Sequence, residues 1–222
     1  MPDSEMSSNL VNFVKAGKKI VAAAANYNSL LALQKVEKPK DPVLFLKPTT
    51  SYIVEGQDII IPKGWKVNEE VELGIIIGKH CKNVDETSAM DYVGGYCVAL
   101  DMTSTSELGV ARSKGWPWTM GKGFDTACPV SRLIKKDEIP NPHDVNLWCD
   151  VNGVQKQAGN TNDLTFTVPE LISYASKFMT LEPNDMILTG SPPGMGPVVH
   201  GDVIEGGIKD LVHFKFNVKE EQ

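Results

Sequence analysis

The sequence predicts an α+β fold that is rich in β-strands, a mixed β-roll or sandwich with few short helices. Three observations lead to this prediction. Short apolar runs recur along the chain and end at Gly, Pro, Asn or Asp, as many short strands do. Helical periodicity is confined to a few short segments. Strand and helix patterns do not alternate regularly, so a parallel βαβ sheet is not expected.

The N-terminal part of the chain predicts two short helices. Apolar residues within 9–18 have amphipathic spacing and indicate a helix that ends before Gly17. An apolar run at 20–25 leads to a second short helix at 30–34, which Ser29 could cap. We expect residues 1–18 to form an N-terminal extension and residues 19–222 to form a single domain, because no linker or repeat divides the chain.

Strand signals dominate the rest of the chain. Apolar or alternating runs bounded by turn residues predict strands at 43–46, 58–61, 70–77, 96–100, 146–151, 186–188, 202–204 and 212–218. Asn152-Gly153 is a strong signal for a hairpin. Residues 89–92 indicate a turn, and a helix is predicted at 168–178, with Pro169 in its first turn.

Charge and cysteine usage limit the partners and the compartment. A net charge of -6 with only two arginines, Arg112 and Arg132, argues against nucleic acid, an anionic membrane surface or a multi-phosphate ligand. No apolar run is long enough to span a membrane. The four scattered cysteines predict free thiols in a reducing compartment. We expect a cytoplasmic or mitochondrial matrix protein, not a secreted one, although acidic residues near the start are unusual in a mitochondrial presequence.

Three carboxylates stand where apolar strands begin or end. Glu70 and Glu72 share one face of the expected strand 70–77, and Asp101 follows the apolar run 96–100. Such carboxylates resist burial unless a positive charge neutralises them. A cluster of three is the ligand set that a hard cation such as Mg²⁺ prefers, with Mn²⁺ as a substitute.

A simpler alternative stays open for the two glutamates. Glu70 and Glu72 could lie on a solvated edge strand beside Lys63 and Lys66. Exposed acidic pairs are common, so residue types alone favour this alternative over a metal site.

An ordered set of motifs resembles the fumarylacetoacetate hydrolase superfamily, and most closely its small members that act as acylpyruvase and oxaloacetate decarboxylase. The motifs follow the family's order from about Lys19 to Val218, nearly the whole chain. They are Val43-Leu44-Phe45-Leu46-Lys47-Pro48, Glu70-Val71-Glu72-Leu73-Gly74, Met90-Asp91-Tyr92-Val93-Gly94-Gly95-Tyr96, Leu100-Asp101-Met102-Thr103, Pro117-Trp118-Thr119 with Lys122, Cys128-Pro129-Val130, Ile172-Ser173-Tyr174 and Leu188-Thr189-Gly190.

The resemblance implies a fold, a site and an assembly. The fold is the family's β-rich roll, commonly found as a homodimer, and the substrate is a small 2-oxo acid that chelates the metal. By position, the metal ligands are Glu70, Glu72 and Asp101. Lys122 matches a lysine that lines the substrate site. The residues that match a substrate-binding loop are Thr189, Gly190 and Ser191, of which Ser191 replaces a threonine and keeps the hydroxyl.

The sequence departs from the family pattern around this site. Leu30 and Leu33 stand where relatives carry the His and Glu that activate water, and leucine cannot accept a proton. Thr105 and Leu108 replace an Arg and a Gln that contact the bound acid, and Glu69 replaces a His before the first ligand. None of the chain's own histidines restores the dyad, because all are expected at the surface: His80, His143, His200 and His213.

These departures leave more than one function open. The first is a metal-dependent enzyme on small 2-oxo dicarboxylates, working by oxaloacetate decarboxylation or keto–enol tautomerisation, neither of which needs the lost base. The second is a catalytically impaired homologue that binds metal and has a structural or regulatory role. The sequence does not rank these two. Acylpyruvate hydrolysis through a substitute base has the least support from the residues.

Overall fold

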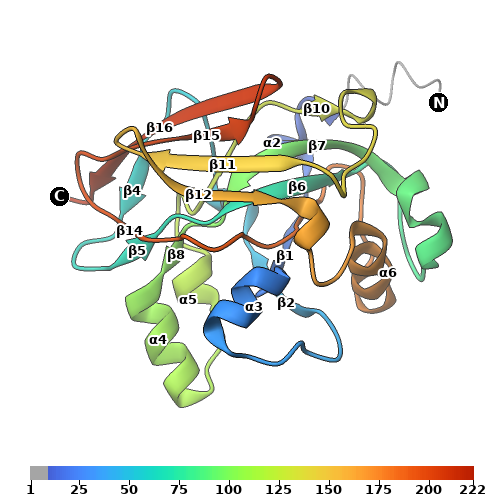
Figure 1. Ribbon diagram of the computed structural model, residues 1–222, viewed down its shortest axis with the longest axis horizontal. Helices are drawn as coiled ribbons and strands as arrows, with labels where there is room; N and C mark the ends of the chain where they lie inside the picture. Colours follow the sequence, from blue (N-terminus) through green and yellow to red (C-terminus); the bar gives the residue numbers. More distant parts are fainter. Residues whose placement is uncertain (1–9) are drawn as a thin grey trace.

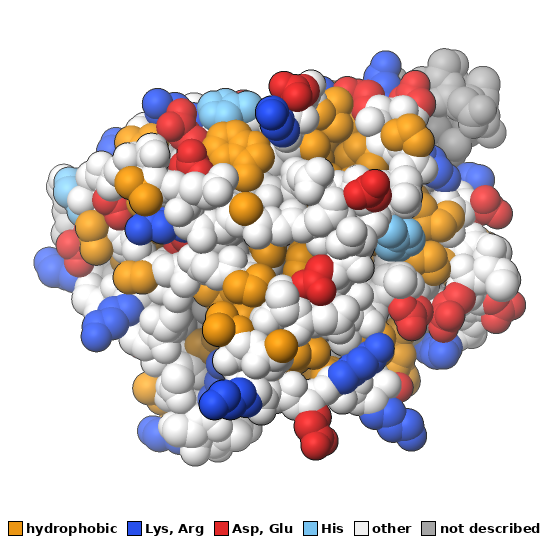
Figure 2. Space-filling view, in the orientation of Figure 1, with side chains coloured by type: hydrophobic (Ala, Val, Ile, Leu, Met, Phe, Trp, Pro, Cys, Tyr) orange, Lys and Arg blue, Asp and Glu red, His pale blue; other side chains and the backbone are white. Residues whose placement is uncertain are grey.

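The structure is a computed structural model that describes residues 10–222. Strands form the centre of the molecule and short helices lie around them (Figure 1). The prediction of a β-rich α+β fold with few short helices is therefore confirmed. Within the described residues no helix is both long and apolar enough to cross a membrane. On the face drawn in Figure 2, basic and acidic side chains are intermingled, without a basic stripe.

The largest sheet carries the strands that matter for function. It contains eight strands, of which seven follow one another in space and β10 (Ile134–Lys135) pairs separately with β7. The seven are, in spatial order, β2 (Val43–Lys47), β1 (Ile20–Ala24), β13 (Met186–Leu188), β6 (Val71–Ile77), β7 (Val93–Leu100), β9 (Cys128–Val130) and β3 (Tyr52–Val54).

Two smaller sheets complete the strand framework. The five-stranded sheet contains, in spatial order, β12 (Val154–Asn160), β11 (Asn146–Val151), β15 (Val203–Ile208), β16 (Val212–Glu220) and β4 (Ile59–Ile61). The three-stranded sheet contains β14 (Pro197–Val198), β5 (Val67–Asn68) and β8 (Thr103–Ser104). The predicted hairpin is present, because β11 and β12 pair antiparallel and both Asn152 and Gly153 have positive φ, as a tight two-residue turn requires.

The helices are short and peripheral. The α-helices are α2 (Phe13–Ala16), α3 (Asn28–Gln34), α4 (Thr105–Lys114), α5 (Thr119–Lys122) and α6 (Val168–Phe178). The 3₁₀ helices are η1 (Thr49–Ser51), η2 (Glu86–Tyr92), η3 (Lys136–Glu138) and η4 (Thr161–Asp163). Helix α6 begins as predicted, with Pro169 in its first turn and a capping box between Thr167 and Glu170.

The structure corrects several predicted boundaries. Of the helix expected at 9–18, Leu10 and α2 (Phe13–Ala16) are helical, a turn at 11–12 separates them, and residue 9 lies outside the described residues. Ser29 is not a cap but a residue within α3, which begins after Tyr27. Helix α4 was not predicted, because its residues are mostly polar and only Leu108 and Ala111 are buried, so the sequence shows no apolar stripe.

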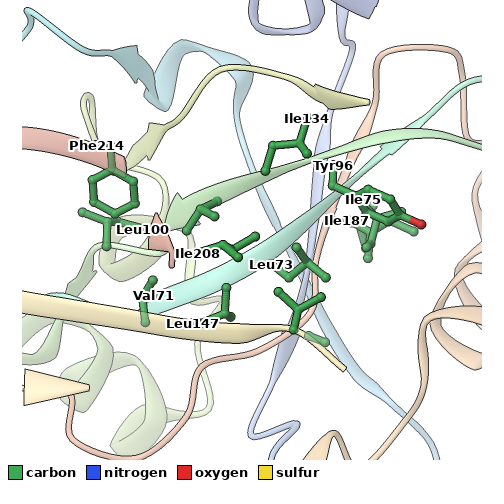
Figure 3. Close-up of a cluster of buried hydrophobic side chains, with 14 of the residues drawn as sticks. Val71, Leu73, Ile75, Tyr96, Leu100, Ile134, Leu147, Ile187, Ile208 and Phe214 are labelled. Carbon is green, nitrogen blue, oxygen red and sulfur yellow. The ribbon is translucent and has the colours of Figure 1, made fainter. Parts of the chain in front are cut away.

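The main core lies between the largest sheet and the five-stranded sheet. Figure 3 shows Val71, Leu73 and Ile75 of β6 directed toward the same cluster as Leu147 of β11 and Ile208 of β15. Because side chains alternate along a strand, Glu72 lies on the opposite face of β6 from these residues. Strand β6 is thus fixed by apolar packing on one face, and this fixes where the Glu72 carboxylate stands on the other.

Candidate functional site

The three predicted ligands converge. One carboxylate oxygen from each of Glu70, Glu72 and Asp101 lies within 4.8 Å of the others. Glu70 immediately precedes β6, Glu72 is its second residue and Asp101 follows β7, the antiparallel neighbour of β6. The backbone N–H of Asp101 donates to the Glu70 carbonyl at 2.8 Å. Sheet pairing therefore brings Asp101 to two carboxylates that lie about thirty residues before it in the sequence.

The solvated-edge alternative for these glutamates is wrong. Strand β6 lies between β13 and β7, so it is not an edge strand. Glu72 and Asp101 are buried, and the Glu70 side chain is only 16% exposed. No ion pair joins Lys63 or Lys66 to either glutamate in the part of the chain that the structure describes. The carboxylates are instead placed at the inner end of a cavity.

Two buried lysines balance part of the carboxylate charge. Lys122 Nζ donates to Glu70, to Asp101 and, at 2.6 Å, to the Thr103 hydroxyl. These three bonds use all three protons of the Lys122 ammonium group. Although burial opposes the ammonium charge, Asp101 and Glu70 raise the pKa of Lys122 above its usual value. The Lys122 ammonium therefore places positive charge beside Glu70 and Asp101, and it is one of the side chains that line the cavity.

The second lysine, Lys47, was not assigned a role from the sequence. Its Nζ is fully buried, lies 2.7 Å from Asp101 Oδ1 and also donates to the carbonyl of Lys122. Burial opposes ionisation of Asp101, but Lys122 and Lys47 outweigh it and keep the Asp101 pKa below its usual value. The only hint of this role in the sequence is that Lys47 directly follows the apolar run 43–46 and precedes Pro48.

Glu72 is the carboxylate that lacks a cation. Its Oε2 accepts the Gly190 N–H at 2.6 Å, but no lysine or arginine lies within salt-bridge distance in the described chain. Burial and the neighbouring Asp101 and Glu70 raise the pKa of Glu72 well above its usual value. The three carboxylates and two lysines sum to one surplus negative charge when all are ionised, and this surplus is centred on Glu72.

The cavity has a volume of about 200 Å³ and leads outward from these carboxylates. Of the three predicted loop residues, Ser191 lines it. The Thr189 hydroxyl donates instead to the Leu73 carbonyl at 3.0 Å, and the Gly190 N–H holds Glu72. Thr189 and Gly190 thus join this loop to β6, while Ser191 is the member that faces the open space.

Two further side chains fix the loop, and sequence reasoning missed one of them. The buried Gln157 accepts the Val71 N–H at 2.8 Å and donates to the Ser191 hydroxyl at 2.7 Å, and nothing in its sequence context on β12 signals this role. Glu69 accepts the Gly196 N–H at 3.1 Å, and burial raises the pKa of Glu69 to about 7. Glu69 therefore anchors the far end of the loop and does not line the cavity.

Comparison with known families agrees with this geometry. Residues 19–219 match the family described as fumarylacetoacetate (FAA) hydrolase, C-terminal. The chain belongs to the fumarylacetoacetate hydrolase family. The match spans nearly the same residues as the resemblance noted in the sequence, from just before β1 to near the end of β16.

Curated members of the fumarylacetoacetate hydrolase family are similar over nearly their whole length. The chain is 44% identical over 217 residues to human oxaloacetate tautomerase FAHD1, mitochondrial, covering 97% of this chain and 98% of that protein. It is 50% identical over 201 residues to an oxaloacetate decarboxylase, mitochondrial, from Dictyostelium discoideum, covering 90% and 92%. These relatives are enzymes, so the enzyme prediction is supported and the non-catalytic alternative is not.

A solved member of the family adds information on ligands. The crystal structure of fumarylpyruvate hydrolase from Pseudomonas aeruginosa, in complex with Mn²⁺ and pyruvate, superposes with a TM-score of 0.86 at 28% identity. The superposition covers 92% of this chain and 91% of that one. That protein therefore binds a divalent cation and a small 2-oxo acid on the same fold.

The donor set of this chain fits a divalent cation. Oxygens that bind one Mg²⁺ lie about 2.0–2.1 Å from it, so they are at most about 4 Å apart, and larger cations allow about 5 Å. The observed 4.8 Å spacing needs only a small contraction of the triad. Glu72 is the second sign, because it is buried beside the carboxylates of Asp101 and Glu70 and no lysine or arginine of the described residues pairs with it.

The family's water-activating dyad is absent from the cavity. Leu30 lines the cavity and is buried, whereas Leu33 is 69% exposed on α3. All four histidines lie outside the cavity lining. Two of them accept backbone hydrogen bonds elsewhere, His143 from Val168 and His200 from Glu220. Apart from the triad, the titratable groups that line the cavity are the two cations Lys122 and Arg112.

Proposed function

We propose that this chain is a metal-dependent enzyme that interconverts the keto and enol forms of oxaloacetate or decarboxylates it. The observation that carries the proposal is the converging triad of Glu70, Glu72 and Asp101 beside the Lys122 ammonium, in a cavity whose lining contains no histidine. Both reactions pass through an enolate, which positive charge stabilises, and neither needs an activated water. Decarboxylation forms the enolate by loss of CO₂ without a base. Tautomerisation must also move a proton between C3 and the enol oxygen, and solvent carries that proton in this proposal.

The triad would hold Mg²⁺ or Mn²⁺, and such an ion supplies the positive charge that polarises the 2-oxo group. Mg²⁺ suits an all-oxygen set, and Mn²⁺ accepts the same ligands. The similarity to relatives named oxaloacetate tautomerase and oxaloacetate decarboxylase supports this choice of substrate.

The chain's own residues have distinct tasks in this proposal. Lys122 places a second positive charge beside the ligands, where negative charge develops on the substrate oxygen. Lys47 holds Asp101 ionised and oriented. The Ser191 hydroxyl, positioned by Gln157, offers a hydrogen bond to the bound acid. Leu30 and Leu108 exclude water from one wall, which strengthens these electrostatic interactions.

The same wall argues against acylpyruvate hydrolysis as the main reaction. Hydrolysis needs a base that removes a proton from water. Leu30 and Leu33 cannot do so, and Lys122 is already protonated. We therefore expect cleavage of an acylpyruvate to be much slower than enolate formation from oxaloacetate.

The first experiment follows oxaloacetate in metal-free protein with and without Mg²⁺ or Mn²⁺. Enol absorbance reports tautomerisation and a coupled assay for pyruvate reports decarboxylation. We expect metal-dependent turnover that is lost in Asp101→Ala, with Glu138→Gln, a surface carboxylate variant, as the control. A rate no greater than that of metal ion without protein would contradict the proposal.

Assembly and compartment form a separate part of the proposal. The fold family and the mitochondrial names of the similar enzymes support a homodimer in the mitochondrial matrix, with the cytoplasm as the other candidate. Light scattering of the purified chain and imaging of a C-terminally tagged protein test these two points separately. A monomer, or a location outside both compartments, would contradict them.

A further inference from the structure

The chain segment that carries two of the three ligands presents one more polar side chain to the cavity. Between residues 67 and 72, Val67 and Val71 pack in the core, whereas Asn68, Glu70 and Glu72 line the cavity. This is the alternation of an extended chain, in which every second side chain lies on the same face. Asn68 is therefore the first member of a row that continues with two of the ligands.

Strand pairing places Asn68 beside the charged centre of the site. Strands β5 and β8 pair antiparallel, and Asn68 stands opposite Thr103 in this register (Figure 1). Directly opposite residues have their side chains on one face, with Cβ atoms about 4.5–5.5 Å apart. Thr103 also lines the cavity, and its hydroxyl accepts a hydrogen bond from Lys122 Nζ at 2.6 Å. The Asn68 carboxamide thus lies at the inner end of the cavity, at the Glu70 end of the row.

Most hydrogen-bond donors at this end are already used within the protein. The three protons of Lys122 go to two ligands and to Thr103. The Thr103 hydroxyl donates to the Asp101 carbonyl at 3.0 Å, and the Gly190 N–H holds Glu72. A cation placed beside three carboxylates forms charge-assisted hydrogen bonds with them, so its protons are not free for a bound molecule.

Asn68 differs from these donors because its side chain is uncommitted. It is partly exposed, and among residues 10–222 its carboxamide has no hydrogen-bond partner. A carboxamide carries two N–H protons and no charge, so it does not form an ion pair with the ligands. Ser191, the other donor that faces the cavity, follows Gly190 and stands at the Glu72 end of the row. The two donors therefore flank the triad from opposite ends.

We propose that Asn68 is a catalytic residue, the neutral hydrogen-bond donor to an oxygen of the bound 2-oxo acid on which negative charge develops in the enolate. The inference rests on the proposed function, because the triad must hold the 2-oxo acid. A donor fixed beside such an oxygen binds it more strongly as it becomes an anion, which stabilises the enolate more than the keto acid. Lys122 thus supplies charge near the ligands, and Asn68 supplies a directed hydrogen bond.

Calorimetry on the Mg²⁺-loaded protein tests this role without requiring turnover. The probes are oxalate, which has a charged oxygen next to its first carboxylate as the enolate does, and pyruvate, whose oxygen at that position is neutral. In Asn68→Leu, which is close in size but has no donor, oxalate should bind about 10- to 100-fold more weakly, the range for a hydrogen bond to a charged group. Pyruvate binding should weaken by less than about tenfold, the range for a neutral acceptor, and Mg²⁺ affinity should not change.

Asn68→Asp distinguishes a donor from a metal ligand. A carboxylate has the size of the carboxamide but can only accept hydrogen bonds. Oxalate should therefore bind Asn68→Asp at least as weakly as Asn68→Leu, although the added charge should tighten Mg²⁺ binding. The matched control is Asn12→Leu, which alters an exposed asparagine before α2 whose side chain makes no capping hydrogen bond. It should leave the affinities for both probes and for Mg²⁺ unchanged.

Three results would overturn the role of Asn68. They are equal weakening of oxalate and pyruvate in Asn68→Leu, a loss of Mg²⁺ affinity in that variant, and oxalate affinity that survives in Asn68→Asp. Failure of the proposed function has a different signature. An oxalate preference that depends on Asn68, without metal-dependent oxaloacetate conversion by the unaltered protein, would contradict the proposed function and leave Asn68 as the anion donor of the site. Absence of binding by either probe would contradict both.

Discussion

The two ends of the cavity differ in how firmly the fold holds them. The inner end is built on β6 and β7, central strands whose opposite faces are packed in the core, and its charged groups are linked by hydrogen bonds. The outer wall is built on α3 and α4, short helices with mostly exposed side chains. Residues at the inner end match the family pattern, and those of the outer wall depart from it. Substitutions on a peripheral helix cost the fold little, so the wall is free to change while the charged centre is kept.

The largest expected effect lies at the inner end, in Lys47→Met. Removing this lysine leaves Asp101 with less compensation in a buried setting, which should lower the free energy of unfolding by about 3 kcal/mol. Denaturant unfolding of the metal-free protein measures it. Added Mg²⁺ should restore part of the loss, since it supplies the missing charge. Lys219→Met removes an exposed partner of Asp58 and should change little. Similar losses in both variants would contradict the contrast between inner and surface charge.

Loss of one ligand tests the charged centre directly. Glu72→Gln is nearly isosteric and keeps an oxygen that can accept the Gly190 N–H, so the fold should survive. Metal affinity and metal-dependent turnover should each fall by at least about 100-fold, because even changes to residues that only support metal ligands cost about 10- to 100-fold. Mn²⁺ titration by calorimetry gives the affinity. Unchanged affinity would show that Glu72 is not a ligand.

The pH dependence of metal binding distinguishes the two ends further. The pKa of Glu72 in the folded, metal-free protein is raised above its unfolded value by burial and by Asp101 and Glu70. The folded protein therefore holds a proton on Glu72 that the unfolded chain releases. The contribution of Glu72 to the free energy of unfolding is present at low pH. It is lost as the pH rises from the pKa of the unfolded chain through the higher pKa of the folded protein. Metal must displace that proton, so affinity for Mg²⁺ should rise with pH, by about tenfold per unit below the Glu72 pKa.

Calorimetry across the pH range, with Glu72→Gln as the comparison, measures this dependence. The variant should retain less of the slope, whereas Arg112→Met at the outer end should retain all of it, since an arginine does not titrate in this range. An affinity that does not change with pH would contradict the assignment of Glu72 as a protonated group that metal displaces.

The smallest expected effect is a gain at the outer wall. The double variant Leu30→His with Leu33→Glu restores the two residue types that the family pattern has at these positions. Leu33 is exposed, so only the Leu30 change disturbs packing. We expect hydrolysis of acetylpyruvate to rise by about tenfold, below the 10²–10⁴ that an evolved base supplies. Leu33→Glu alone is the control. If hydrolysis did not increase, the cavity wall formed by α3 and α4 would have to differ from that of relatives in more than the missing His and Glu.

Much of the strand framework could be predicted from local patterns. The runs at 43–46, 96–100 and 212–218 are apolar or alternating and are closed by turn residues, and each is a strand in the structure. Helix α4 could not be predicted, because its residues lie against the cavity and solvent and leave no apolar stripe. Residue types alone favoured a solvent-exposed edge strand for Glu70 and Glu72, because exposed acidic pairs are common. Only the order of the strands in the sheet shows that β6 is a central strand.

The sequence by itself determined the family, the strand-rich class and the three carboxylates, because ordered motifs and residue chemistry are local information. Tertiary structure alone decided how the charges are balanced. Lys47 and Gln157 reach the site through contacts with residues dozens of positions away in the sequence. The end of an apolar run was the only local signal for Lys47, and Gln157 had none. Tertiary structure also decided that Asp101 and Glu70 raise the pKa of Lys122 against the effect of burial, and that Glu72 has no cation beside it in the described chain. The cost of a charge depends on the groups that the fold places around it.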